Sequence, residues 1–412
     1  MFIPNSGRST VLLCLLAALT TTAQGSMELV YPLNLHRIGA ALPVVGATVA
    51  LTNLGQLSSR LPGGAVYSLR RTRALNVGGQ AVAGLSTLGL SQAGGLGLQA
   101  ALGCLHGFAF GLVTTFLLAT VIEARQHGRP MAAAIAWYTA AISAGYAIGA
   151  PLAAQSILAF GHAGAFAVSG SVSLAAGALS LLIPRGEGQG GGRTAHRHRP
   201  GLVGVRSLPA GVWLATLIGL YINLVNDAQG AFFPIYAVGA GISLGVVGLL
   251  KSAQSLSAVG IRFMAAGIFR FVDPGILNHV CVIALALAVA GIVATRQPGL
   301  LLAVCLVWGA ARGLLRVTSA VMVAEQKDRA GAHVGLASGV YNAGLDLGSL
   351  LAPPVTGMLA ARIGIRASFQ VLAVVLPLLY YAGYLVARVR SGSPGAEGPQ
   401  GAVGSSPPAS AE

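Results

Sequence analysis

The sequence predicts an all-α integral membrane protein with twelve transmembrane helices in two six-helix repeats. Three observations support this prediction: an extreme hydrophobicity, a series of long apolar runs and an internal repeat at a nearly constant offset. Of the 412 residues, 55% are hydrophobic and only 8% are charged, and the mean hydropathy is +0.76. A soluble domain carries about 25% charged residues, so a single water-soluble core does not account for this composition.

A helix needs about 20 apolar residues to cross the hydrocarbon core of a bilayer. Glycines in such runs are compatible with helices, because small residues let membrane helices pack closely. The first run also resembles a signal peptide, but the internal repeat includes the same residues, which favours a retained helix. The expected spans lie near residues 9–34, 40–62, 74–95, 98–122, 131–155, 162–183, 209–234, 241–265, 276–295, 299–324, 333–359 and 367–388.

The net charge of +15 raises the question of a nucleic-acid partner. The basic residues argue against it, because they gather on one side of the predicted spans and only Arg37, Arg296, Arg362 and Arg366 lie on the other. This asymmetry is typical of multi-pass proteins and places both termini in the cytoplasm. We therefore expect a monomeric protein that lies in the lipid bilayer of the plasma membrane.

No cofactor, metal site or enzymatic activity is expected. The sequence has no His-Glu-x-x-His zinc motif and no Gly-Lys-Ser/Thr phosphate loop. The four cysteines fall inside predicted spans without metal-ligand spacing, so we interpret them as small apolar packing residues: Cys14, Cys104, Cys281 and Cys305.

The two halves of the chain align with each other. The segment "GLVTTFLLATVIE" (111–123) matches "GLLRVTSAVMVAE" (313–325) at an offset of 202. Parallel repeats of this kind are a feature of membrane transporters. The repeat predicts a bundle over 1–184, a glycine-rich basic linker over 185–206, a second bundle over 207–390 and a disordered tail over 391–412. Further aligned pairs are Arg60 with Arg262, Pro32 with Pro234, Gly46 with Gly248, Tyr138 with Tyr341, Pro151 with Pro354 and Gly161 with Gly364.

Twelve spans, a duplicated six-helix unit and a basic central loop resemble the major facilitator superfamily. The loop "SRLPGGAVYSLRRTR" (59–73) is similar to the family signature, with Gly64, Arg70 and Arg71, although Ser68 and Leu69 replace the usual Asp-Arg pair. The stretch "GYAIGAPLAA" (145–154) is similar to the glycine-proline motif of the family's exporters. It keeps Gly145, Gly149 and Pro151 but has Ala150 where that motif has glycine.

The resemblance implies that the first, fourth, seventh and tenth helices line a central cavity. Polar residues in these helices recur at spacings of three and four, which place side chains on one helical face. Ionisable residues inside a span are costly and usually face a partner or a water-filled cavity. We interpret the following as candidates for binding substrate or protons: Glu28, His106, Asn223, Asn226, Asp227, Trp308, Arg312, Arg316 and Asp346. Structural ion pairs, a hydrogen-bonded histidine and simple aromatic packing are the alternative interpretations.

A second set is interpreted as gating residues. It includes residues of the two motifs, namely Gly64, Arg70, Arg71, Gly145, Gly149 and Pro151, and four further charged residues. Arg60 and Arg262 lie near the cytoplasmic ends of their helices, and Glu123 and Glu325 end helices on the same side. Ion pairs among them would close the cytoplasmic face, whereas simple anchoring of basic residues on that side is the alternative.

The function expected from these features is that of a secondary transporter that exports a small molecule by proton antiport. Proton-coupled uptake is one alternative, and a receptor or scaffold that has kept the fold without transport is another. A cavity containing acids, arginines and asparagines suits a polar or zwitterionic solute, or an amphipathic drug.

Overall fold

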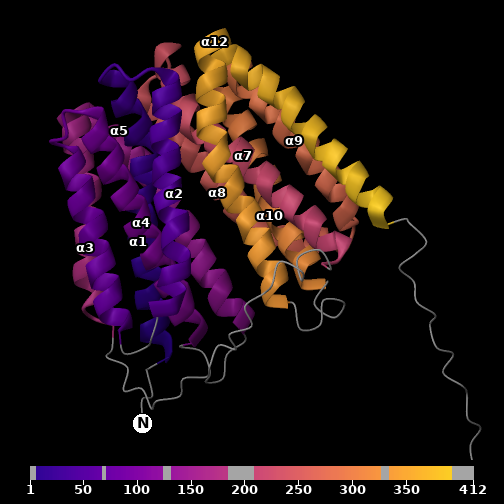
Figure 1. The fold of residues 1–412 in the computed structure, drawn as a ribbon, viewed down its shortest axis with the longest axis horizontal. Helices are drawn as coiled ribbons and strands as arrows, with labels where there is room; N and C mark the ends of the chain where they lie inside the picture. Colours follow the sequence, from indigo (N-terminus) through magenta and orange to yellow (C-terminus); the bar gives the residue numbers. More distant parts are fainter. Residues whose placement is uncertain (1–5, 67–70, 124–130, 184–207, 326–333, 392–412) are drawn as a thin grey trace, which may run out of the picture.

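The computed structural model describes residues 6–66, 71–123, 131–183, 208–325 and 334–391. Within these ranges the regular secondary structure is helical, with no strand (Figure 1). The predicted linker and C-terminal tail lie almost wholly outside the described residues. The helices are α1 (Ser6–Arg37), α2 (Leu42–Val66), α3 (Thr72–Leu90), α4 (Leu96–Glu123), α5 (Met131–Ser180), α7 (Ala210–Gly239), α8 (Leu244–Ile268), α9 (Pro274–Ala294), α10 (Pro298–Glu325) and α12 (Val334–Ser391).

Two of these helices are unusually long because each joins two helices at a glycine. In α5, of 50 residues, Gly161 has φ 69° and ψ −176°. In α12, of 58 residues, Gly364 has φ 80° and ψ 158°. Side chains with a Cβ rarely adopt this backbone region, so glycine is the residue that permits the sharp change of direction. Figure 1 shows the bend of α12 at the top of the molecule.

The predicted repeat is visible in the backbone. Among the described residues, the glycines with positive φ form two pairs. Gly39 and Gly241, with φ 87° and 85°, are 202 positions apart, and Gly161 and Gly364 are 203 positions apart. Packing repeats as well, because α1 packs on α5 as α7 packs on α12, and α2 packs on α4 as α8 packs on α10. Helices α1–α5 therefore form one group and α7–α12 a second group (Figure 1).

The two groups contact each other through α2 with α12 and through α5 with α8. At Gly46 of α2, a Cβ would overlap the carbonyl of Pro353 and lie 3.1 Å from Cα of Pro354. At the repeat-related Gly248 of α8, a Cβ would lie 3.0 Å from the carbonyl oxygen of Ala150 and 3.1 Å from Cα of Pro151. Glycine thus permits two equivalent backbone contacts between the groups. The end of the molecule at which these contacts lie is called the closed end below.

Replacing Gly46 by valine is expected to lower the midpoint of thermal unfolding. The branched side chain has no room against Pro353, and overpacking of this kind costs about 1–3 kcal/mol. Gly78→Ala in α3 is the matched control, because nothing lies within 4 Å of a Cβ at that position. Thermal unfolding of the two purified variants checks this prediction, and equal midpoints would contradict it.

Eight of the described helical stretches are long and apolar enough to cross a membrane. Two of them, Trp137–Ser180 and Gly339–Val386, have 44 and 48 residues, more than twice the about 20 needed for one crossing. Helices α2 and α3 are not among the eight. Large apolar side chains such as Leu158, Leu287 and Leu378 are exposed, as expected where lipid covers the surface.

Candidate substrate cavity

A cavity of about 1360 Å³ lies between the two groups of helices. Its walls come from α1, α2, α5, α7, α8, α10 and α12, whereas α4 contributes His106 alone. The prediction that the fourth helix lines the cavity holds for His106 alone. Thr114 of α4 does not line it, and its hydroxyl donates to the carbonyl of Phe110 in its own helix, at 3.0 Å.

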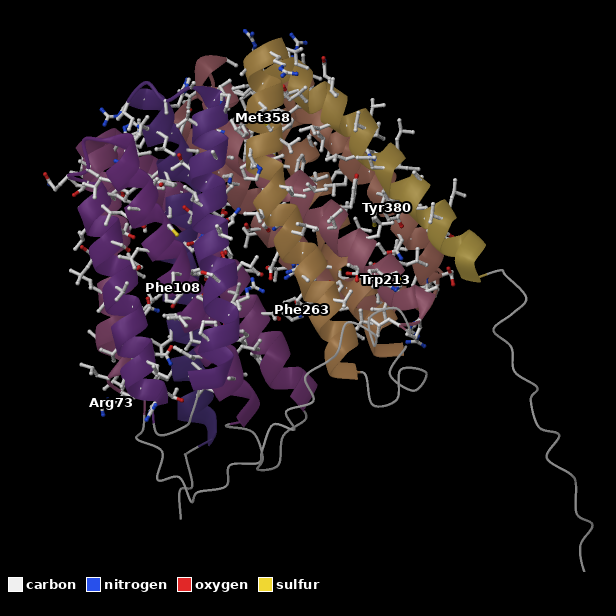
Figure 2. All side chains as sticks on the ribbon, in the orientation of Figure 1. Arg73, Phe108, Trp213, Phe263, Met358 and Tyr380 are labelled. Carbon is white, nitrogen blue, oxygen red and sulfur yellow. The ribbon has the colours of Figure 1, made fainter. Side chains whose placement is uncertain are left out.

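The cavity extends away from the closed end. Its lining includes Thr139 of α5, Phe263 of α8 and Ala320 of α10, all toward the opposite ends of their helices from the closed-end contacts. Figure 2 shows Phe263 between the two groups in the lower part of the molecule and Met358 of α12 near the top. The end of the cavity near Phe263 is called the open end below.

The wall formed by α7 and α10 carries a chain of hydrogen bonds. The guanidinium of Arg312 donates to Oδ1 of Asn226. The amide of Asn226 in turn donates to Oδ1 of Asp227, at 2.8 Å. Asp227 is thus connected to Arg312 through a neutral amide, with no direct ion pair between them in the described structure.

One turn away, Asn223 connects α7 to α10 and α12. Its Oδ1 accepts from Arg316 at 3.5 Å, and its amide donates to the carbonyl of Leu345 at 2.9 Å and to the hydroxyl of Ser349 at 3.0 Å. The predicted grouping of the polar residues of α7 on the cavity side is observed, since Asn223, Asn226 and Asp227 all line the cavity.

Glu28 of α1 lies on the opposite wall. Its electrostatic neighbours across the cavity are Lys251 of α8, Asp227 and Arg312. Lys251 is 9% exposed and is a functional candidate that the sequence analysis did not identify. Its signal was available in the sequence, because a lysine within an apolar span is rare.

An ion pair joins the two groups at the side of the cavity. Nη2 of Arg60 in α2 lies 3.1 Å from Oδ1 of Asp346 in α12. At the repeat-related position, Nη1 of Arg262 in α8 donates to the hydroxyl of Ser143 in α5, at 3.5 Å. Asp346 and Ser143 are 203 positions apart, so the same contact occurs twice, once as an ion pair and once as a hydrogen bond to a hydroxyl.

The predicted partners of these arginines were different. Glu123 and Glu325 end α4 and α10, but their side chains lie outside the described residues. Pairing of the arginines with these glutamates therefore stays a prediction. Among the described residues, Arg60 pairs with Asp346, because α2 packs along α12 and brings the two side chains together.

His106 and Trp308 differ in their surroundings. Nε2 of His106 lies 2.9 Å from Oε1 of Gln24, and Nδ1 lies 2.9 Å from the hydroxyl of Thr87. The histidine thus joins α1, α3 and α4 at the cavity wall. Trp308 is 1% exposed and belongs to the hydrophobic core. Its ring does not line the cavity in this structure, which favours the alternative interpretation of simple aromatic packing.

The glycine-proline segment of α5 packs closely on α1. A Cβ at Gly145 would overlap Thr21, and a Cβ at Gly149 would lie 2.9 Å from Cα of Gly25. The hydroxyl of Ser26 donates to the carbonyl of Gly149 at 2.8 Å. Pro151 belongs to the closed-end contact described above.

The predicted signature loop is only partly described. Arg71 is exposed just before α3. Gly64 falls within the bounds of α2, but its surroundings lie outside the described residues, as does the whole of Arg70.

Two groups of helices related by a repeat, with a charged cavity between them, define a transporter-like membrane bundle. The family model of the Major Facilitator Superfamily matches residues 13–337. The chain belongs to this superfamily, so it is a multi-pass membrane protein of a transporter family and not an enzyme.

Solved structures show the same fold. A variant of the nucleoside transporter NupG has a TM-score of 0.78 at 12% identity, covering 92% of this chain and 99% of its own. A bacterial homologue of the human lysosomal transporter Spinster, in an inward-facing and unoccupied conformation, has a TM-score of 0.70 at 14% identity, covering 94% and 98%. No curated protein matches the chain.

Proposed function

We propose that this protein is a secondary active transporter that exports a small solute by proton antiport. The observation that carries the proposal is one cavity lined by ionisable side chains from both helix groups. Alternating access requires such a site between two repeats that rock against each other. The closed end and the open end then correspond to the two sides of the membrane.

We further propose twelve membrane crossings with both termini in the cytoplasm. α5 and α12 would each provide two crossings, joined at Gly161 and Gly364. Arg73 lies at the lower end of the molecule in Figure 2, the same end as the open end of the cavity. The positive-inside rule assigns that end to the cytoplasm, so the conformation described here would be inward-facing.

Cysteine labelling tests this topology. A cysteine at position 190, which lies outside the described residues, should react with an impermeant reagent only after the cells are opened. The test uses Gly190→Cys in a background lacking the four native cysteines. Labelling from outside intact cells would contradict the topology.

Proton coupling is proposed for Asp227 and Glu28. Both carboxylates line the cavity, and neither makes an ion pair within the described structure. Burial disfavours the charged form of a carboxylate, whereas a fixed arginine partner would hold it charged. Such groups can take up a proton on one side and release it on the other. The glycine-proline segment of α5 favours export over uptake.

Gradient-driven flux is the direct test of the proposed function. A substrate panel in a strain lacking its own exporters identifies a solute, which is then measured in reconstituted vesicles. An imposed pH gradient should drive the solute against its own gradient, and a protonophore should abolish the accumulation. Accumulation in the same direction as proton flow would indicate uptake, and flux insensitive to pH and to membrane potential would indicate a facilitator. Absence of any flux would support a receptor or scaffold.

A further inference from the structure

The charges of the cavity are unevenly divided. Three acidic side chains line it, Glu28, Asp227 and Asp346. Five basic side chains also line it, so the described wall has a formal excess of two positive charges: Arg60, Lys251, Arg262, Arg312 and Arg316. Four of the five bases come from α8 and α10. One side of the cavity is therefore strongly cationic.

Two of these bases, Lys251 of α8 and Arg312 of α10, come from helices that pack on each other and face Glu28 across the cavity. Lys251 and Arg312 are electrostatic neighbours of each other and of Glu28. Within the described residues, no carboxylate lies within ion-pair distance of either base. Lys251 makes no hydrogen bond to any described residue, although only 9% of its surface is exposed to solvent.

Arg312 has donors to spare. A guanidinium carries five N–H donors. The hydrogen bond described for Arg312 is the one to the neutral amide of Asn226, and its Nε is buried without a partner. A buried cation without an anion is costly, and an arginine fork matches the two oxygens of a carboxylate or phosphate.

We propose that Lys251 and Arg312 form a subsite for an anionic oxygen group, a carboxylate or a phosphate, of the transported solute. This inference rests on the proposed transport function and gives its substrate class. Glu28, on the opposite wall, accepts a hydrogen bond from an amine or hydroxyl elsewhere on the same solute. The solute is therefore a small hydrophilic anion or zwitterion rather than an amphipathic cation.

The internal repeat supports a dedicated site. At the offset of 202, Lys251 corresponds to Val49 and Arg312 corresponds to Phe110. The scaffold contacts occur twice, but these two charges occur once. They are therefore not part of the duplicated packing that holds the two groups together.

Equilibrium binding tests the subsite without requiring transport. Thermal unfolding of the purified full-length protein is followed with matched probes at constant ionic strength: alanine and alaninamide, succinate and succinamide, glycerol phosphate and glycerol. At least one probe that carries a carboxylate or phosphate should raise the midpoint, and its counterpart without that group should not. A response to carboxylates alone or to the phosphate alone identifies which oxygen group the solute carries.

Variants complete the test. Lys251→Gln should weaken the apparent affinity for the effective probe by about tenfold or more, the loss expected for a charge-assisted hydrogen bond. Lys251→Arg should retain most of it, and Arg270→Gln should not change it, because Arg270 is exposed beyond the end of α8.

Three results would overturn the proposal. The first is that no probe with a carboxylate or phosphate stabilises the protein. The second is equal stabilisation by the counterparts that lack this group, and the third is an unchanged affinity in a folded Lys251→Gln variant. Binding that persists without gradient-driven flux would instead contradict the proposed transport function and leave the subsite established.

Discussion

Asp227→Asn is expected to abolish gradient-driven transport, reducing flux to that of vesicles without protein. Asparagine keeps the shape and can still accept from the amide of Asn226, which lies 2.8 Å from Oδ1 of Asp227. The substitution removes the negative charge and, with it, the ability to bind and release a proton. The chain of hydrogen bonds from Arg312 through Asn226 should survive, so expression and solute binding should remain close to the parent.

The measurement compares two modes of transport in the same vesicles. Net accumulation driven by a pH gradient should be lost, whereas counterflow exchange of labelled for unlabelled solute needs no net proton movement and should persist. Asp273→Asn is the matched control. Asp273 caps α9 outside the cavity, accepting from the backbone of Gly275 at 2.7 Å, and asparagine is an equally good N-cap. Accumulation at the parental rate in Asp227→Asn would exclude this residue and direct attention to Glu28.

Breaking the Arg60–Asp346 ion pair is expected to have the second largest effect, by changing the balance between the two cavity orientations. The pair joins α2 and α12, so it stabilises the conformation described here. The side chain of Arg60 is 38% exposed and that of Asp346 is 13% exposed. Solvent screening therefore limits the contribution of the ion pair to about 1 kcal/mol, or about a fivefold change in the equilibrium between the two cavity orientations.

Exchanging the two charges distinguishes an ion-pair role of Asp346 from a direct role on protons or solute. Asp346→Asn should slow transport by about fivefold, and the double variant Arg60→Asp with Asp346→Arg should recover most of the rate. Ser143→Ala is the control at the repeat-related contact, where Arg262 donates a long hydrogen bond of 3.5 Å to an uncharged hydroxyl, and it should change the rate little. If the single variant is slow and the exchange does not rescue it, Asp346 acts alone on protons or solute.

Much of the fold could be predicted from residue patterns. The apolar runs gave helices that the structure places within a few residues, as with the expected 98–122 and the observed Leu96–Glu123. The repeat at offsets of 202 and 203 predicted the equivalence of Gly161 and Gly364, and both adopt the same backbone region. These predictions succeed because hydrophobic length and glycine requirements are local properties of the chain.

The site was predicted only in part. The polar face of α7 could be read from the spacing of Asn223, Asn226 and Asp227, which helical geometry places together. The position of Trp308 could not be predicted. Its four-residue spacing to Arg312 places the two side chains on one face of α10, but it does not show whether that face turns toward the cavity or toward the hydrophobic core. Lys251 was not assigned for a related reason: the resemblance directed attention to the first, fourth, seventh and tenth helices, whereas α8 also forms a cavity wall.

The sequence by itself determined that this is a duplicated helical membrane protein, because the composition, the length of the apolar runs and the repeat can be read from the order of the residues alone. Which charges meet was decided only by the tertiary structure. Arg60 and Asp346 are separated by most of the protein's length, and their contact depends on how α2 crosses α12. Glu28 and Lys251 face one another across a cavity whose walls come from both halves. The physical reason is that helix formation follows local hydrogen bonds and hydrophobicity, whereas electrostatic partners depend on rotations and crossings set by packing of the whole bundle.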